Sequence, residues 1–160
     1  MTIRAIRKNL IDIIETNNYS ELYNYLLENN FKYLDDHNEI IYYAIIYKFI
    51  NNNNTAGYVW LYELEQPKEY MVHLYIHDDY KGKTLTRFVV NKFYEMTAQY
   101  ADKLIADPID KNLIELYKRI GWQQTSSHSS GIKLPYEWRR KHGSSYKNIE
   151  KSRVKSSKTT

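Results

Sequence analysis

The chain has 160 residues, which suits one compact domain, and its 42% of hydrophobic residues is enough to build a core. It has no cysteine, which excludes a disulfide framework, a cysteine-ligated metal site and a cysteine nucleophile. No signal peptide is visible, and the longest apolar run, from Ile40 to Ile50, is about half the length of a membrane span and contains Lys48. We therefore expect a soluble, intracellular protein without a membrane segment.

The net charge of +4 is unevenly distributed along the chain. From Arg139 to Thr160 there are eight Lys or Arg residues and one Glu, whereas the preceding 138 residues carry 15 basic and 18 acidic side chains. This change in composition divides the chain into a domain over residues 1–138 and a basic tail over residues 139–160. We expect the tail to be disordered unless a partner binds it, and either a protein or a nucleic acid would be a suitable partner.

The N-terminal part of the chain reads as mostly helical. Residues 1–6 could form a short first strand, and the spacing of the apolar residues predicts a helix over residues 8–16. A second helix is predicted from Ser20, as its N-cap, to about Asn29. The polar residues 33–38 are typical of a loop.

The pattern then changes to that of strands. Three runs rich in β-branched and aromatic residues, at 40–50, 57–65 and 70–76, are separated by turn signals at 51–54 and 66–68. Because the connections between these runs are short, we expect an antiparallel meander.

The last part of the domain alternates between helix and strand. Residues 84–100 have the apolar period of a helix, residues 103–106 read as a strand, and residues 111–120 read as a helix that ends at Gly121. Residues 122–138 could supply one or two final strands. Two strands joined by a crossover helix run parallel, so the sequence predicts an α+β fold with a central mixed, mostly antiparallel sheet and helices on both faces.

Two motifs lie on these elements. The first runs from Leu74 to Arg87, and the second consists of Asn112 followed by Tyr-x-x-x-Gly-Trp from Tyr117 to Trp122. Together they resemble the signature of the GNAT acetyltransferase superfamily, in which an apolar strand and a glycine-containing turn lead into a long helix, and an Asn and a Tyr-x-x-x-Gly-aromatic motif follow. The resemblance covers residues 57–122 and implies a GNAT-like fold with acetyl-CoA as co-substrate.

The resemblance also implies where acetyl-CoA would bind. In the family, the fourth strand is bulged and splays from the fifth, and the pantetheine arm lies in the gap. The residues that would line the arm here are Tyr75, Ile76 and His77. The residues that would hold the pyrophosphate are Lys81, Gly82, Lys83, Thr84, Leu85, Thr86 and Arg87, and Asn112 would contact CoA or cap the local turn. A helix N-terminus suits this role because its unpaired N–H groups and its positive dipole end attract an anion.

The proposed pyrophosphate segment departs from the family pattern at two positions. Thr84 and Thr86 stand where the family has glycines, which let the backbone approach the phosphates closely. A threonine hydroxyl could donate to a phosphate oxygen, or the side chain could block the site.

Two residues are candidates for the chemistry. Acetyl transfer to an amine needs an acceptor for the amine proton, and His73 stands where family members often place a strand-four Glu. Glu63 and Glu69 are alternative bases. Tyr117 matches the family tyrosine that lies near the CoA sulfur and protonates the thiolate. Both candidates also have a purely structural interpretation. His73 could be a strand histidine hydrogen-bonded to a neighbour, and Tyr117 could be one packed tyrosine among 17.

No metal site is predicted. The histidines are scattered, and His73 and His77, four residues apart on one strand, would lie about 13 Å apart, which is too far to share an ion.

Two functions of different classes follow from these patterns. The first is a cytoplasmic N-acetyltransferase that transfers an acetyl group from acetyl-CoA to an amine of a protein or small molecule. The second is a catalytically degenerate GNAT-fold structural or interaction protein, for example a phage virion component, that binds a partner through residues 139–160. Thr84 and Thr86, the absence of a carboxylate at the position of His73, and the basic tail favour the second function.

Overall fold

The computed structural model describes residues 10–108, 110–126 and 129–134. These residues form a seven-stranded sheet in the order β1-β2-β3-β4-β5-β7-β6. The strands are β1 (Ile11–Thr16), β2 (Ile45–Asn51), β3 (Asn54–Glu63), β4 (Glu69–Ile76), β5 (Lys103–Ala106), β6 (Gln123–Gln124) and β7 (Ser130–Lys133). Only β4 and β5 run parallel, and the other neighbouring strands are antiparallel. The α+β class and the mixed, mostly antiparallel sheet are therefore confirmed.

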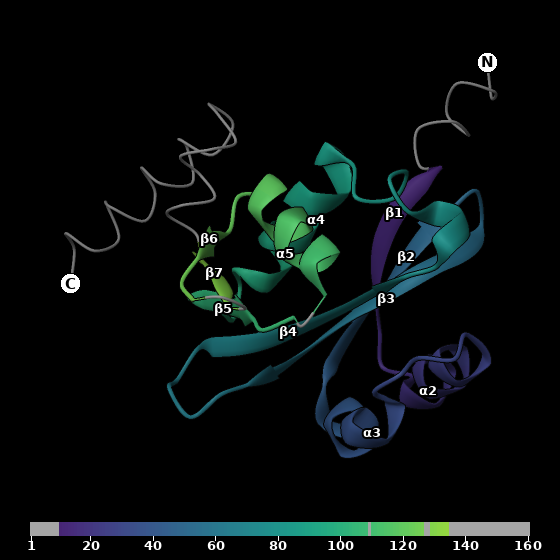
Figure 1. Cartoon of the computed structure of the whole chain (residues 1–160), viewed down its shortest axis with the longest axis horizontal. Coiled ribbons are helices and arrows are strands. Elements are labelled where there is room, and N and C mark those ends of the chain that lie inside the picture. The colour runs from purple at the N-terminus through teal and green to yellow at the C-terminus, as the bar shows by residue number, and fades with distance from the viewer. Residues whose placement is uncertain (1–9, 109, 127–128, 135–160) are drawn as a thin grey trace.

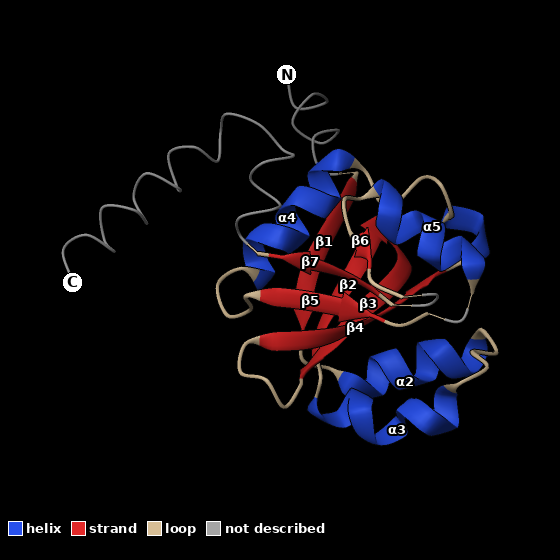
Figure 2. Cartoon of the chain, turned by 60° about the vertical axis from the view of Figure 1, so that its left-hand side comes forward, coloured by secondary structure: helices blue, strands red, loops and turns tan. Residues whose placement is uncertain are grey.

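Helices cover both faces of this sheet (Figures 1 and 2). The helices α2 (Tyr19–Glu28) and α3 (Leu34–Tyr43) lie on one face, and α4 (Arg87–Thr97) and α5 (Lys111–Arg119) lie on the other. Alternate residues of β3 enter two separate cores: Tyr58 and Trp60 pack under α2 and α3, whereas Val59 and Leu61 belong to the core on the α4 side. Each face of the sheet therefore has its own hydrophobic core.

The predicted meander and crossover are confirmed. The turn between β2 and β3 places Asn52 and Asn53 at φ angles of 51° and 68°, a left-handed conformation that asparagine tolerates better than most residues. The helix α4 connects the parallel strands β4 and β5, as the crossover pattern predicted. Gly121 follows α5 with a φ of 106°, which explains why a glycine ends that helix.

Residues 11–16 form a strand, so the helix predicted over residues 8–16 is wrong for this stretch. Ile11 and Ile13 pack against the α4-side core, while Ile14 and Glu15 are exposed. β1 pairs with β2 over six residues, from Ile11 opposite Asn51 to Thr16 opposite Ile46. The spacing of the isoleucines fits both the helical period and the two-residue period of a strand. Residues 11–16 form a strand because they pair with β2 and because β-branched residues favour strands.

Residues 34–43 form a helix, so the loop predicted at 33–38 and the strand start predicted at residue 40 are also wrong. Leu34 and Ile41 lie on the buried face of α3 and pack in the same core as Trp60. This packing overrides the strand preference of the isoleucines and tyrosines that follow. The N-cap of α2 is Asn18, whose side chain accepts a hydrogen bond from the backbone N–H of Glu21 at 3.0 Å, and not Ser20.

Some predictions fall outside the described residues. These are the first strand at 1–6, the end of the segment 122–138, and the basic tail at 139–160. Within the ranges that the structure does describe, none of the helices is long and apolar enough to cross a membrane.

A partly buried polar link holds α2 on the sheet. A carboxylate oxygen of Glu21 accepts hydrogen bonds from the Lys48 ammonium at 2.6 Å and from the Tyr58 hydroxyl at 2.7 Å. The bond from Lys48 and then the bond from Tyr58 lower the pKa of Glu21. Because the charged carboxylate is the better acceptor, Glu21→Gln should lower the free energy of unfolding by about 1–2 kcal/mol in urea denaturation at pH 7. Glu28→Gln, on the exposed side of the same helix, should change it by less than about 0.5 kcal/mol, and equal losses in the two variants would contradict the link.

Candidate functional site

The sheet opens between its two parallel strands. β4 pairs with β5 only from Glu69 to Met71, so the part of β4 from Val72 to Ile76 has no partner strand on that edge within the described residues. This is the splay that the family resemblance implied. It leaves a row of strand N–H and C=O groups along an open edge, where an extended ligand could lie.

β4 itself is regular, so the implied bulge in this strand is wrong. Its register with β3 runs without interruption from Gly57 opposite Ile76 to Glu63 opposite Tyr70. The two strands are also unusually close at Gly57, where an added Cβ would lie 2.2 Å from the carbonyl oxygen of Tyr75. The close contact at Gly57 and the unbroken ladder fix the end of β4 from which the next loop leaves.

The loop after β4 folds back on itself, and its backbone faces outward. His77 Nδ1 accepts a hydrogen bond from the backbone N–H of Asp79 at 3.0 Å and so caps the short 3₁₀ helix η1 (Asp78–Tyr80). Gly82 has a φ of 76°, which favours glycine, and the space where its Cβ would be is open. The side chain of Thr84 is fully buried, and its hydroxyl donates to the carbonyl oxygen of Tyr80 at 3.0 Å. Thr84 therefore points into the loop and leaves its outer surface clear.

Thr86 is the N-cap of α4 and takes one of the helix N–H groups. Its hydroxyl accepts a hydrogen bond from the backbone N–H of Val89 at 3.2 Å. The backbone N–H groups of Leu85, Arg87 and Phe88 form no hydrogen bond with any described residue. Three donors at the positive end of a helix dipole therefore remain for an anion, and a pyrophosphate fits this donor set.

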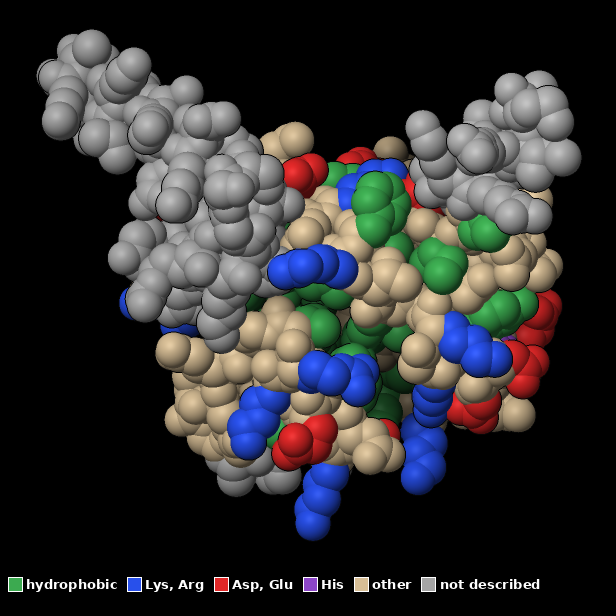
Figure 3. All heavy atoms as spheres, turned by 90° about the horizontal axis from the view of Figure 1, so that it is seen from above, with side chains coloured by type: hydrophobic (Ala, Val, Ile, Leu, Met, Phe, Trp, Pro, Cys, Tyr) green, Lys and Arg blue, Asp and Glu red, His purple; other side chains and the backbone are tan. Residues whose placement is uncertain are grey.

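Cationic side chains surround this helix end. Lys81, Lys83 and Arg87 are exposed, and the Lys81 ammonium lies 2.9 Å from the Asp78 carboxylate. That hydrogen bond is the main reason why the pKa of Lys81 is raised, and Asp110 at the start of α5 adds to the effect. Lys83 and Arg87 form no ion pair within the described part of the chain, so their charges are available to a ligand. Figure 3 shows Lys and Arg side chains around a central area of hydrophobic side chains on the upper face of the molecule.

An apolar cavity lies beneath the open edge, between β4, α4 and α5. Its volume is about 30 Å³, and it is lined by Phe49, Val59, Val72, Leu74, Leu85, Val89, Val90, Phe93, Tyr117, Ile120 and Trp122. This volume is enough for about one water molecule, so a pantetheine arm would lie along the edge of β4 rather than inside the cavity. Tyr117, one of the sequence candidates, therefore lies directly behind that edge.

Solved structures with the same architecture are known, although the chain matches no protein-family model and no curated protein. Spermidine N-acetyltransferase from Vibrio cholerae superposes with a TM-score of 0.61 and 14% identity, over 84% of this chain and 99% of that one. The Bacillus subtilis acetyltransferase in complex with CoA gives a TM-score of 0.60 and 15% identity, over 78% and 99%. An acetyltransferase of the GNAT family from Streptococcus pneumoniae gives 0.57 and 13%, over 78% and 99%. The chain has the GNAT fold.

Within this GNAT fold, Tyr117 is almost completely buried, with 3% of its surface exposed. Its ring packs against Trp122, with the ring centroids 4.5 Å apart, and its hydroxyl has no hydrogen-bond partner among the described residues. Burial raises the pKa of Tyr117. The phenol therefore keeps its proton at neutral pH and is available as a donor.

His73 lies on the opposite face of β4, under α2 and α3. Its ring stacks between Trp60 and Tyr62, with centroid distances of 5.8 Å and 5.6 Å, and contacts His37 at 4.3 Å. Burial, and then the proximity of His37, lower the pKa of His73 to about 4. At neutral pH the imidazole of His73 is therefore unprotonated and can accept a proton.

The fold brings some candidates together and separates others. Residues 81–87 lie together in the loop after β4 and the start of α4, with Thr84 buried beneath the others. Tyr75 faces α2, where its ring meets that of Tyr25, whereas Ile76 is buried in the core on the other side. Tyr117 and His73 lie on opposite faces of the sheet, so only a ligand in the open edge of β4 could reach both. Asn112 is exposed in the first turn of α5, and its backbone N–H donates to the Asp110 side chain.

Two residues of this region were not singled out by the sequence. His37 was assigned to a loop, because α3 was not recognised, so its contact with His73 could not be anticipated. Gly57 is the first residue of the strand predicted at 57–65, whereas the structure places it inside β3, where a glycine marks a close approach of two backbones. No group of three potential metal-ligating side chains occurs within the described ranges.

Proposed function

We propose that this chain is an acetyl-CoA-dependent N-acetyltransferase. The observation that carries the proposal is the combination of an open β4 edge with three N–H donors at the start of α4, none of which is paired by the part of the chain that the structure describes. An extended ligand with a pyrophosphate at one end matches this arrangement. The shared fold with acetyltransferases, one of them solved with CoA, supports the proposal.

Acetyl-CoA would be held mainly by the backbone. The pyrophosphate would accept hydrogen bonds from the N–H groups of Leu85, Arg87 and Phe88, with Lys83 and Arg87 supplying positive charge. The pantetheine arm, which contains two amide groups, would pair with the free edge of β4 from Val72 to Ile76. Gly82 gives the loop that leads to these donors a left-handed turn.

The proposed chemistry needs two protons to move. The amine nitrogen attacks the thioester carbonyl carbon, the carbon–sulfur bond breaks, the nitrogen loses a proton and the departing thiolate gains one. His73 is the candidate acceptor for the amine proton, either directly or through water, and its low pKa makes it a weak base. Tyr117 is the candidate donor to the thiolate, because its raised pKa keeps the hydroxyl protonated.

The acceptor is proposed to be an amine of a small molecule or protein, and the face formed by α2 and α3 favours a positively charged one. Residues 19–43 carry five acidic side chains and one basic side chain. Such a surface attracts cations to the face of β4 that bears His73. Tyr25, Phe31 and Tyr75 add aromatic rings on the same side, and aromatic faces also bind cations.

Acetyl-CoA should raise the melting temperature of the protein, since a ligand that binds only the folded state stabilises it by mass action. At 100 times the dissociation constant the gain is about 2.7 kcal/mol, which corresponds to a shift of at least several degrees for a domain of this size. The absence of any shift at millimolar acetyl-CoA would contradict the proposal.

Tyr117→Phe should lower turnover by about 100-fold and leave the dissociation constant of CoA within about twofold, because it removes only the proposed proton donor. The hydroxyl has no partner among the described residues, so the variant should fold as the wild type does. Tyr23→Phe, which removes a hydroxyl from α2, is the matched control and should retain full turnover. Equal turnover for wild type and Tyr117→Phe would exclude Tyr117 as the donor.

A structural or interaction protein that has lost catalysis is the second candidate. The N-cap role of Thr86 favours it, because the hydroxyl removes one N–H group from the anion site. The basic tail proposed to bind a partner lies outside the described residues. Loss of a partner on deleting residues 141–160, together with failure to bind acetyl-CoA, would favour this function over the first.

A further inference from the structure

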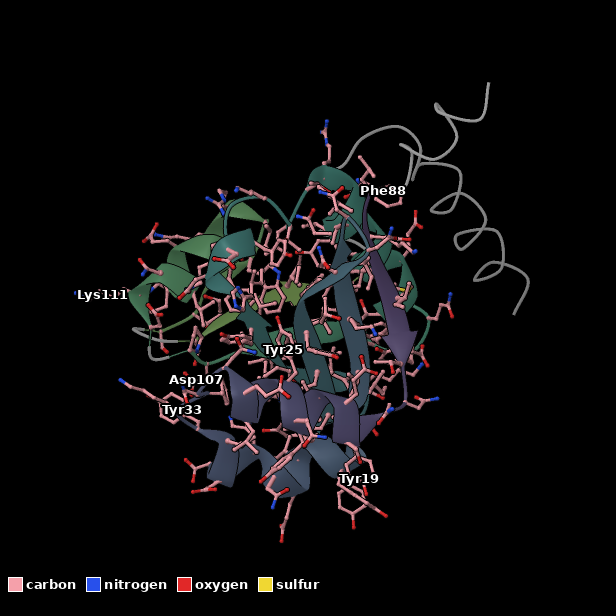
Figure 4. All side chains as sticks on the ribbon, turned by 90° about the vertical axis from the view of Figure 1, so that its right-hand side faces the viewer. Tyr19, Tyr25, Tyr33, Phe88, Asp107 and Lys111 are labelled. Atoms are coloured by element: carbon pink, nitrogen blue, oxygen red, sulfur yellow. The ribbon has the colours of Figure 1, made fainter. Side chains whose placement is uncertain are left out.

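A pair of imidazoles joins α3 to the sheet. His37 of α3 and His73 of β4 lie with their ring centroids 4.3 Å apart and their planes at 89°. The contact joins the helix layer to the sheet, on the face where the hydrophobic core under α2 and α3 lies. Figure 4 shows the layer formed by α2 and α3 from the side, with Tyr25 of α2 lying between these helices and the sheet.

The surroundings of the pair suit neutral rings. The indole N–H of Trp60 donates to His37 Nδ1 at 3.3 Å, so this nitrogen carries no proton and the neutral ring holds its proton on Nε2. The rings of Trp60 and Tyr62 stack on His73, and the ring of Phe31 meets His37 edge to face at 5.6 Å. His73 Nε2 is buried and has no hydrogen-bond partner among the described residues.

The charged groups around the pair do not stabilise positive charges on the two rings. Asp36, on α3 itself, favours the protonated form of His37, but burial outweighs it and the pKa of His37 is lowered. For His73, burial and His37 both act in the same direction and lower the pKa. From β3 the pair is faced by Trp60 and the neutral phenol of Tyr62, whose pKa is raised by burial.

We propose that His37 and His73 form an acid-sensitive link, which holds α3 on the sheet while both rings are neutral and releases it when they bind protons. A proton on His37 Nδ1 removes the acceptor for the Trp60 indole. The protonated ring of His73 carries N–H groups on both nitrogens, and its buried Nε2 has no partner among the described residues. Two cationic rings at this distance also repel each other, so the pair titrates as a coupled unit. The link does not depend on the proposed acetyl transfer.

The direction of the pH effect follows from the lowered pKa values. In the unfolded chain both histidines titrate near 6.5, whereas in the folded protein the pKa of His73 is about 4. Between these values the unfolded state binds more protons, so stability is complete above about pH 6.5 and is lost as the pH falls toward 4. Each histidine changes the ratio of folded to unfolded protein by up to about tenfold per pH unit in this window.

Urea denaturation between pH 7.5 and pH 4.5 measures this loss. His73→Phe keeps a flat ring between Trp60 and Tyr62, and His37→Asn keeps an acceptor for the indole N–H of Trp60. The phenylalanine and asparagine side chains do not bind protons in this pH range. We expect the urea midpoint of the wild type to fall more steeply below pH 6.5 than that of either variant. His77→Asn, which retains a cap for η1, is the matched histidine control and should follow the wild type. Wild type and His73→Phe curves that run parallel from pH 7.5 to 4.5 would overturn the proposal.

Hydrogen exchange locates the opening. After correction for intrinsic rates, amides of α3 should lose protection about tenfold or more between pH 7 and pH 5, while amides of β3 and α4 keep theirs. In His37→Asn and His73→Phe, which each keep one titrating ring, the loss of α3 protection between these pH values should be smaller than in the wild type. Unchanged protection of α3 in the wild type, or the same loss in both variants, would overturn the link even if the whole protein is less stable in acid.

Discussion

Replacing Gly57 with alanine should lower the free energy of unfolding by at least about 3 kcal/mol, which is a large part of the stability of an ordinary domain. The added Cβ would lie 2.2 Å from the carbonyl oxygen of Tyr75 and 2.9 Å from the Cα of Ile76. Both atoms belong to the backbone, so the clash cannot be relieved by a change of rotamer. β3 and β4 would have to separate at the point where β4 meets the loop of the proposed site.

Gly131→Ala is the matched control, because Gly131 is also a strand glycine with a negative or extended φ. Its added Cβ would lie 3.3 Å from the carbonyl oxygen of Leu104, which requires a shift of only a few tenths of an ångström. We expect a loss below about 1 kcal/mol by urea denaturation. If the two variants lost the same stability, the close approach of β3 and β4 at Gly57 would be refuted.

Reversing the charges of Lys83 and Arg87 at the start of α4 should weaken CoA binding by at least about 100-fold. In the double variant Lys83→Glu/Arg87→Glu, two attractive contacts with phosphate become repulsive, and hydrogen bonds to charged groups contribute about 1.5–3 kcal/mol each. Isothermal titration with CoA at low ionic strength measures the change. The effect should diminish as salt is added, because both side chains are exposed.

The double variant Lys32→Glu/Lys68→Glu makes the same change in net charge far from the site. Lys32 lies between α2 and α3, and Lys68 lies in the turn between β3 and β4. If binding depends on the local charges at α4, this control should retain the affinity of the wild type within about threefold. An equal loss in both double variants would mean that only the overall charge of the protein matters.

The sequence was sufficient to predict the part of the fold that positions the site. The runs that became β3 and β4 have turn residues at both ends, and the helical period predicted from residue 84 begins shortly after Gly82, within the first motif. These signals are local, and the packing of the domain agrees with them. The residues assigned to the anion site therefore lie together in the structure, on one loop and one helix start.

Long-range packing decided what the sequence could not. α3 has an isoleucine- and tyrosine-rich end that resembles a strand, and it becomes a helix because Leu34 and Ile41 pack in one core with Trp60. The contact between His37 and His73 depends on this helix, so the contact could not be predicted while α3 was not recognised. The roles of Thr84 and Thr86 were likewise open, since a side chain can point into or out of a loop. The structure turns Thr84 inward and uses Thr86 as a cap.

Binding of the CoA pyrophosphate by the backbone at the start of α4 should be visible in an amide chemical-shift titration. With ¹⁵N-labelled protein and CoA added to millimolar concentration, the largest shifts should be those of Gly82, Leu85, Arg87 and Phe88, followed by the edge of β4 from Val72 to Ile76. Shifts confined to other elements, or no shifts at all, would contradict binding of the pyrophosphate at the start of α4.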